Sequence, residues 1–124
     1  MTPMQNKSQE KHSGMIDALA GSYPGMKRLG FWKAVGDLAT ELGCEVETRK
    51  TFLPDAYRLN RETSEIEIHE VVRTHDLDHH KMKALGLMWE DWDCDAGHDW
   101  LPVLYIHRRS LPVQRVELSD YAYL

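Results

Sequence analysis

Two carboxylates that can face each other across a hairpin are the residues of this chain best placed to do chemistry. Asp55 and Glu70 lie in two β-type runs separated by a polar turn at residues 60–64. If the turn is centred near Glu62 and Thr63, Asp55 falls opposite Glu70 and both side chains share one face. Opposed residues of such a pair have Cβ atoms about 4.5–5.5 Å apart. Like charges this close repel unless a cation or proton lies between them, so the pair predicts a divalent-metal site.

The second run, residues 65–72, alternates strictly between two faces of a predicted strand. Glu70 shares its face with three apolar residues. A single carboxylate on an otherwise apolar face is unusual and suggests a functional role. The apolar residues are Ile66, Ile68 and Val72. Glu65 and Glu67 lie on the other face with His69, where we expect a solvated strand surface. An alternative register uses Glu67 and His69 as an acid and a base two residues apart.

Helical and β-type patterns surround this hairpin. A short helix is expected over residues 15–19, and a longer one over 26–42 carries the apolar stripe Trp32, Val35, Ala39 and Leu42. Further on we expect a strand over 44–52, the hairpin of 54–73, a helix over 79–94, a buried strand over 101–106 and a last strand over 111–118. Gly43 is placed to end the long helix, and Asp78 to cap the later one. A strand, a helix and a second buried strand predict a parallel crossover. The expected fold is therefore α/β, a mixed β-sheet flanked by helices on both faces.

The bulk properties predict one globular domain. The 124 residues are 42% hydrophobic and 28% charged, as in ordinary soluble proteins. We expect residues 1–14 to form a disordered tail and residues 15–124 to form the domain. No apolar run reaches the roughly 20 residues that span a bilayer, so no membrane partner is expected and the cytoplasm is the default location. Cys44 and Cys94 have no metal-type spacing, and we expect buried thiols.

The element order, with Pro54-Asp55 and Glu70 on the next strand, resembles the PD-(D/E)xK nuclease superfamily. The likeness covers about residues 27–107 and is nearest to small phage members, virus-type replication-repair nucleases and Holliday-junction resolvases. It implies a restriction-endonuclease-like core of order α-β-β-β-α-β. It also implies a site for Mg²⁺ or Mn²⁺, hydrolysis of DNA phosphodiesters and a homodimer. Carried over to this sequence, the metal ligands are Asp55, Glu70 and the backbone carbonyl of Val71.

The lysine of the family motif is absent, because Val72 occupies its position two residues after Glu70. In the family this lysine activates the attacking water or neutralises charge developing on the phosphate, which valine cannot do. We expect Lys81, at the start of the following helix, to supply the cation, in preference to Lys83 or Arg73. An upstream acid on the first long helix often completes such sites, and Asp37 and Glu41 are both candidates.

Two functions remain open at this point. The first is a metal-dependent DNA nuclease that uses Asp55, Glu70 and Lys81. The second is a catalytically inactive phage protein of the same fold that binds and regulates a host macromolecule, which fits the net charge of −5 and the missing lysine.

Two further groups are weaker signals. His75, His79 and His80 could offer nitrogen donors to zinc, but their spacing matches no structural zinc module, and we expect solvated histidines. Arg108 and Arg109 follow the buried strand; they are placed to contact a phosphate backbone, although a solvated strand end is the commoner situation.

Overall fold

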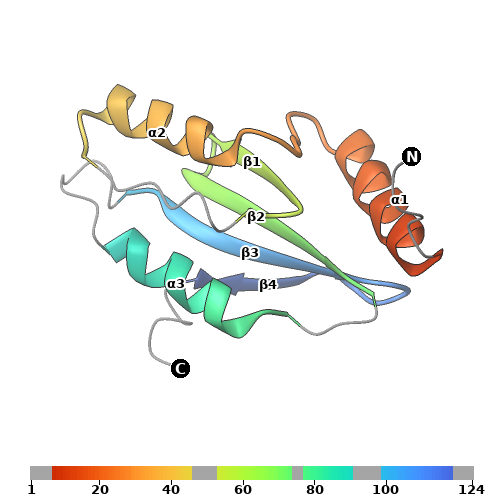
Figure 1. Ribbon diagram of the computed structural model, residues 1–124. Helices are drawn as coiled ribbons and strands as arrows, with labels where there is room; N and C mark the ends of the chain where they lie inside the picture. The colour runs from red at the N-terminus through yellow and green to blue at the C-terminus, as the bar shows by residue number, and fades with distance from the viewer. Residues whose placement is uncertain (1–6, 46–52, 74–76, 91–98, 119–124) are drawn as a thin grey trace, which may run out of the picture.

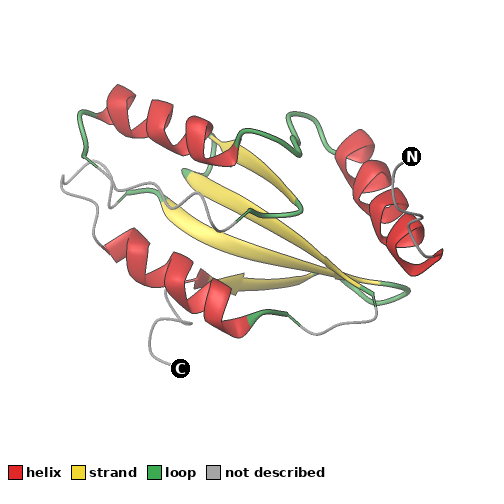
Figure 2. Cartoon of the chain, viewed as in Figure 1, coloured by secondary structure: helices red, strands yellow, loops and turns green. Residues whose placement is uncertain are grey.

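The computed structural model describes residues 7–45, 53–73, 77–90 and 99–118, leaving aside the side chains of 7–10 and 87–90. Within these residues the chain forms three helices and a four-stranded mixed sheet (Figures 1 and 2), which confirms the predicted mixed α/β class. The elements are α1 (Lys7–Ser22), α2 (Phe31–Leu42), β1 (Ala56–Asn60), β2 (Glu65–Val72), α3 (His79–Glu90), β3 (Leu101–Arg108) and β4 (Gln114–Glu117). Residues 7–14, expected in a disordered tail, are the first turns of α1.

The hairpin of β1 and β2 has the predicted register. Ala56 pairs with His69 and Asn60 with Glu65 in an antiparallel ladder. Asn60 holds the turn because its Oδ1 accepts hydrogen bonds from the backbone N–H groups of Glu62 and Thr63, at 3.1 and 3.3 Å. One step before Ala56, this register sets residue 55 level with residue 70.

β2 and β3 pair in parallel with α3 between them in the chain, which confirms the predicted crossover. β4 then pairs antiparallel with β3, so the strands lie in the order β1-β2-β3-β4. The strand expected over 44–52 lies outside the described residues, except for Cys44 and Glu45.

α2 and α3 pack on the same face of the sheet. Their buried apolar residues, among them Phe31, Val35 and Met82, form one cluster with the even-numbered side chains of β2, Ile66 and Ile68. The prediction of helices on both faces is therefore wrong for α2 and α3. The reason is the alternation in β2, which gives only one face enough apolar surface to hold them.

Local contacts fix where the helices begin and end. α2 begins at Phe31 rather than near residue 26, because the backbone of Lys27 is already paired with Tyr57 by two hydrogen bonds of 2.9 and 2.8 Å. Gly43 ends α2 as predicted, with φ 72° in the left-handed region. Asp78 caps α3 as predicted, since its Oδ1 accepts a 3.1 Å hydrogen bond from the N–H of Lys81.

Cys44 corrects one expectation. It is buried, with 8% of its surface exposed, but it is disulfide-bonded rather than a thiol. Cys94 lies outside the described residues. In the described part of the chain, no helix has the length and apolar character needed to cross a membrane.

Candidate active site

Asp55 and Glu70 meet at the edge of the core, as predicted. Glu70 is 8% exposed, on the face of β2 that carries Ile66 and Ile68. Burial, and then the neighbouring charge of Asp55, raise the pKa of Glu70 to about 7. Asp55 is held in place because its Oδ2 accepts a 2.8 Å hydrogen bond from the N–H of Val71. Two acidic groups therefore lie together in a partly buried position, and the fold holds them there in spite of their mutual repulsion.

Lys81 reaches this pair from the first turn of α3. Its Nζ donates hydrogen bonds to Oε1 of Glu70 at 2.8 Å and to the carbonyl oxygen of Leu53 at 2.6 Å. The cation expected to replace the missing motif lysine is thus in contact with the second acidic residue. Asp78 supports this placement because it caps the helical turn that carries Lys81.

His12 of α1 completes the surroundings and was missed by the sequence analysis. Its Nε2 lies 2.8 Å from the carbonyl oxygen of Val71 and 3.6 Å from Oδ2 of Asp55. A carbonyl oxygen has two lone pairs, so the Val71 carbonyl keeps capacity for a second partner. The sequence signal for His12 was its spacing from Ile16, which is 4% exposed. His12 lies four residues before Ile16, so both residues are on the same side of α1.

The upstream acids predicted for the site are elsewhere. Asp37 pairs with Lys33 at 2.9 Å on an exposed part of α2. Glu41 pairs with Arg61 at 2.8 Å, near the hairpin turn. Asp37 and Glu41 are thus removed as candidates, because the side of α2 that bears them faces solvent while its apolar stripe faces the sheet.

A cavity of about 560 Å³ opens beside Asp55. It lies between α1, the segment before α2 and the segment before β1. Its lining residues are Ile16, Arg28, Leu29, Gly30, Phe31, Leu53, Pro54 and Asp55. One acidic group in a largely apolar wall, with one arginine, provides room for a ligand next to the carboxylate pair.

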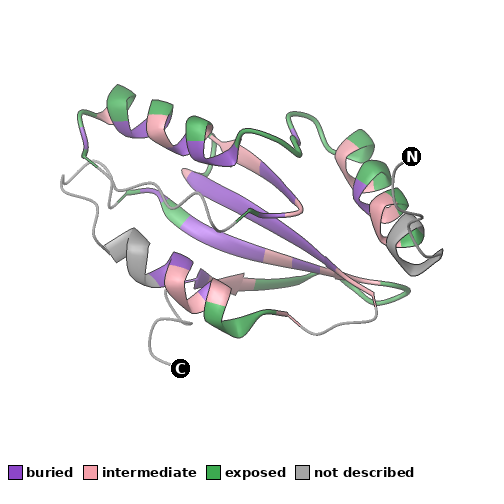
Figure 3. Ribbon diagram, viewed as in Figure 1, coloured by how far each residue is buried: buried purple, intermediate pink, exposed green. Residues whose placement is uncertain are grey.

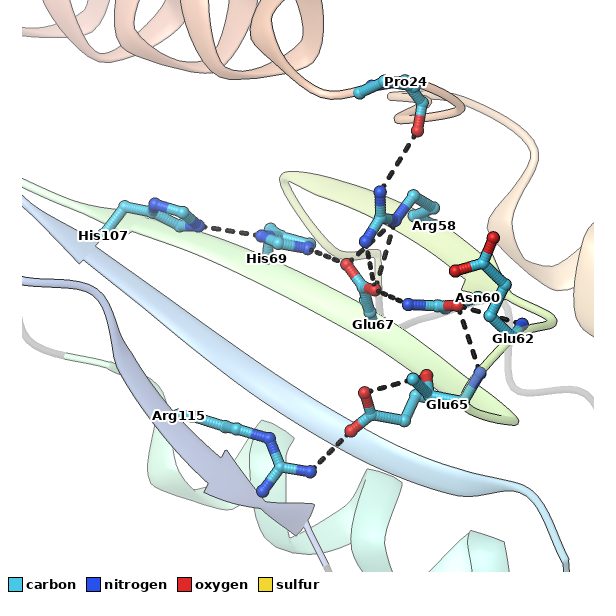
Figure 4. Close-up of polar contacts among 10 residues, drawn as sticks. Pro24, Arg58, Asn60, Glu62, Glu65, Glu67, His69, His107 and Arg115 are labelled. Atoms are coloured by element: carbon cyan, nitrogen blue, oxygen red, sulfur yellow. Dashed lines mark hydrogen bonds and ion pairs between the residues drawn. The ribbon is translucent and has the colours of Figure 1, made fainter.

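The opposite face of the sheet holds a separate polar network (Figure 4). At its centre the Glu67 carboxylate, 3% exposed, accepts hydrogen bonds from Nη2 of Arg58 at 2.7 Å and from Nδ2 of Asn60 at 3.0 Å. Burial raises the pKa of Glu67, but the hydrogen bonds from Arg58, His69 and Asn60 outweigh it and leave the pKa below its ordinary value. Glu67 and His69, the acid and base of the alternative register, do contact each other. They lie on the face of the sheet opposite to Glu70 and are not part of the site with Asp55.

A chain of two histidines extends this network. His69 Nε2 lies 3.0 Å from Oε1 of Glu67, and His69 Nδ1 lies 2.8 Å from Nε2 of His107. Burial lowers the pKa of both histidines, that of His107 to about 4. Since a carboxylate only accepts, neutral His69 carries its proton on Nε2, and His107 must donate from its own Nε2. His69 also stacks on Tyr105, with ring centroids 4.8 Å apart.

Glu65 and Glu67 are buried, which corrects the expectation of a solvated face. Figure 3 shows β2 buried along most of its length. Glu65 pairs with Arg115 of β4 at 2.5 Å, and Glu67 with Arg58 of β1. Arg58 comes from β1, the neighbour of β2, whereas Arg115 comes from β4, on the far side of β3. Single-strand alternation cannot reveal such partners.

The histidine cluster gains no support as a metal site. His75 lies outside the described residues, while His79 and His80 are exposed at the start of α3. Across the described ranges, no three His, Cys, Asp or Glu side chains are grouped to hold a metal ion. Any cation at Asp55 and Glu70 would therefore depend on backbone carbonyls and water for its other ligands.

Comparisons with protein-family models, with curated proteins and with solved structures found no match for this chain.

Proposed function

We propose that this protein is a metal-dependent nuclease that hydrolyses phosphodiester bonds of DNA. One observation carries the proposal: two adjacent carboxylates, Asp55 and Glu70, with Lys81 Nζ 2.8 Å from the second. The resemblance to the PD-(D/E)xK superfamily calls for this set of groups, and the lysine comes from α3 instead of β2.

The donor set fits a hard divalent cation. Asp55, Glu70 and the Val71 carbonyl offer oxygen only. The raised pKa of Glu70, caused by burial and then by the charge of Asp55, supports a site at which a cation would favour the charged carboxylates. Mg²⁺ and Mn²⁺ use such oxygen ligands and keep several waters, so a site with few protein ligands suits them. When bound, such an ion supplies Lewis acidity and lowers the pKa of a water molecule.

The protein's own groups have defined parts in hydrolysis. Glu70 must lose its proton to bind the cation, so its pKa of about 7 sets the pH range in which the site is competent. Lys81 offers a positive charge that stabilises negative charge on the phosphate in the transition state. His12, whose Nε2 donates to the Val71 carbonyl at 2.8 Å and lies 3.6 Å from Asp55, can position that carbonyl at the site.

Thermal melting with Mn²⁺ tests the metal site, because a ligand that binds only the native state raises the melting temperature by mass action. Wild-type protein should melt higher as Mn²⁺ is added, and Asp55→Ala should not. Glu62→Ala, at the exposed turn, is a matched control that should respond as the wild type does. Cleavage of linear, supercoiled and branched DNA in Mn²⁺ then tests activity. No cleavage of any of these DNAs would refute the nuclease.

One observation favours a second function. The ion pair with Lys81 satisfies Glu70 without any metal, as in a site that has lost its chemistry. On this reading the protein is an inactive nuclease-fold member, phage-encoded, that binds a host macromolecule. A melting temperature unchanged by Mn²⁺ would support this alternative and contradict the first.

A further inference from the structure

The ends of β2 and β3 lie beside α1 (Figure 1). A second cavity, of about 430 Å³, is lined by residues of α1 and of these two strand ends. Six residues line it: Lys11, Gly14, Met15 and Ala18 from α1, with Arg73 and Arg109 from the two strand ends. Three of the six are cationic and none is acidic. In a protein with a net charge of −5, this is a local concentration of positive charge.

Arg73 has a hydrogen-bonding group with which none of the described residues pairs. Its Nη1 is buried and has no hydrogen-bond partner among the described residues, as is also true of Nη1 of Arg108 on the same strand end of β3. A buried donor without a partner destabilises the folded protein, and more so when the donor is charged. Arg73 also lines the cavity, and guanidinium groups bind phosphate oxygens in a forked geometry.

The cavity is next to the carboxylate site, because α1 and the end of β2 each contribute residues to both. Lys11 adjoins His12, whose Nε2 contacts the Val71 carbonyl, and Arg73 is two residues beyond Val71. Two residues span about 7 Å along a strand. Neighbouring phosphates of one DNA strand lie further apart than their axial spacing of about 3.4 Å, because the strand winds around the axis. The span therefore corresponds to about one phosphate step.

We infer that this cavity binds backbone phosphates of a polynucleotide, adjacent to the phosphate that lies at Asp55 and Glu70. The inference rests on the proposed function and gives it a direction: the nucleic acid passes the end of α1, with one phosphate at the carboxylate pair and its neighbours at Arg73, Arg109 and Lys11. The acidic remainder of the surface repels the polynucleotide and so favours this track.

Fluorescence anisotropy of the full chain with a labelled 20-base-pair DNA duplex, and with its single strand, tests the inference. EDTA is included so that neither metal binding nor hydrolysis contributes. The variants are Arg73→Gln and Arg109→Gln, singly and together, and Arg73→Lys. Arg61→Gln is the matched control, because it removes the same charge from an exposed residue at the opposite end of β2.

For the wild type, log Kd should rise with log salt concentration with a slope of about 0.9 per phosphate contact. The double variant should bind about tenfold more weakly or worse, and its slope should fall by about 2. Arg73→Lys should keep most of the slope, and Arg61→Gln should match the wild type. Arg109→Gln alone changes an exposed residue, so its loss cannot be attributed to misfolding.

Absence of wild-type binding to either DNA in EDTA would overturn the inference, as would an equal loss in Arg61→Gln. The result is separable from the metal test. A protein that binds Mn²⁺ and cleaves DNA, with Arg73→Gln and Arg109→Gln unaffected in DNA affinity, would refute the cavity alone. A protein that loses DNA affinity in these variants but never responds to Mn²⁺ would refute hydrolysis and leave the cavity standing.

Discussion

Lys81 Nζ lies 2.8 Å from Oε1 of Glu70, although the two residues belong to a helix and a strand eleven positions apart in the chain. The contact brings a cation to the second acidic residue from α3. The superfamily that the sequence resembles would carry its lysine two residues after that acid, where this chain has Val72.

Lys81→Met is expected to lower DNA cleavage by a factor of about 10²–10³, as when other enzymes lose one preorganised electrostatic group. Its charge also lowers the pKa of Glu70, so its removal should move the pH midpoint of Mn²⁺ binding above that of the wild type. Cleavage rates and Mn²⁺ titrations at several pH values measure both effects. Lys33→Met, on the exposed side of α2, should change neither. An unaltered cleavage rate in Lys81→Met would show that the ion pair is only structural.

The affinity for Mn²⁺ should depend on pH through Glu70. Below its pKa of about 7 the carboxyl group holds a proton that the metal must displace, so affinity should fall by up to about tenfold per pH unit. Above that pH the affinity should level off. Calorimetric titration at pH 6, 7 and 8 checks this. Glu70→Gln should bind weakly at all three values, and a wild-type affinity that is constant from pH 6 to 8 would contradict the assignment.

Glu67→Ala should destabilise the fold by roughly 2–3 kcal/mol, because it leaves Arg58 and Asn60 without their buried partner. The value is below that for a fully buried pair, since the Arg58 side chain is 25% exposed. Urea unfolding measures the loss, and the folded variant should still bind Mn²⁺, because Glu67 is on the other face of the sheet from Glu70. Glu62→Ala should leave the urea midpoint nearly unchanged, and a similar midpoint for Glu67→Ala would refute the prediction.

Acid should destabilise the protein through His107. Its pKa is about 4 in the folded protein, below the ordinary 6.5. Between these values the unfolded chain takes up a proton that the folded protein refuses, so the free energy of unfolding falls as pH falls from about 6.5 to 4. His69 has the same sign.

Glu70 has the opposite effect on the free energy of unfolding, because its pKa is raised from the ordinary value of 4.5 to about 7. Its contribution to stability is complete below pH 4.5 and is lost as the pH rises through about 7. The measurement therefore uses Glu70→Gln as the parent protein, with urea midpoints at pH 7, 5.5 and 4.5. Adding His107→Asn should flatten the decline. Parallel curves for the two proteins would exclude His107 as the source.

The hairpin and its acidic pair were predictable because strand alternation and turn length are local properties. Asn60 to Ser64 fix the turn, and the register of Asp55 against Glu70 follows by counting. Lys81 was also predictable, as the nearest lysine after β2. The partners of Glu65 and Glu67 were not, because Arg115 and Arg58 reach them from other strands of the sheet, β4 and β1. His12 was missed since the composition of the first residues reads as a tail, whereas Ile16 docks that segment.

The parallel pairing of β2 with β3 joins residues as far apart as Glu65 and Leu101. During synthesis the two acidic residues can come together as soon as their hairpin emerges from the ribosome. The orientation of α3, and with it the lysine, has to wait for the strand that follows. Chains truncated before residue 101 should therefore hold both acids without a correctly docked Lys81.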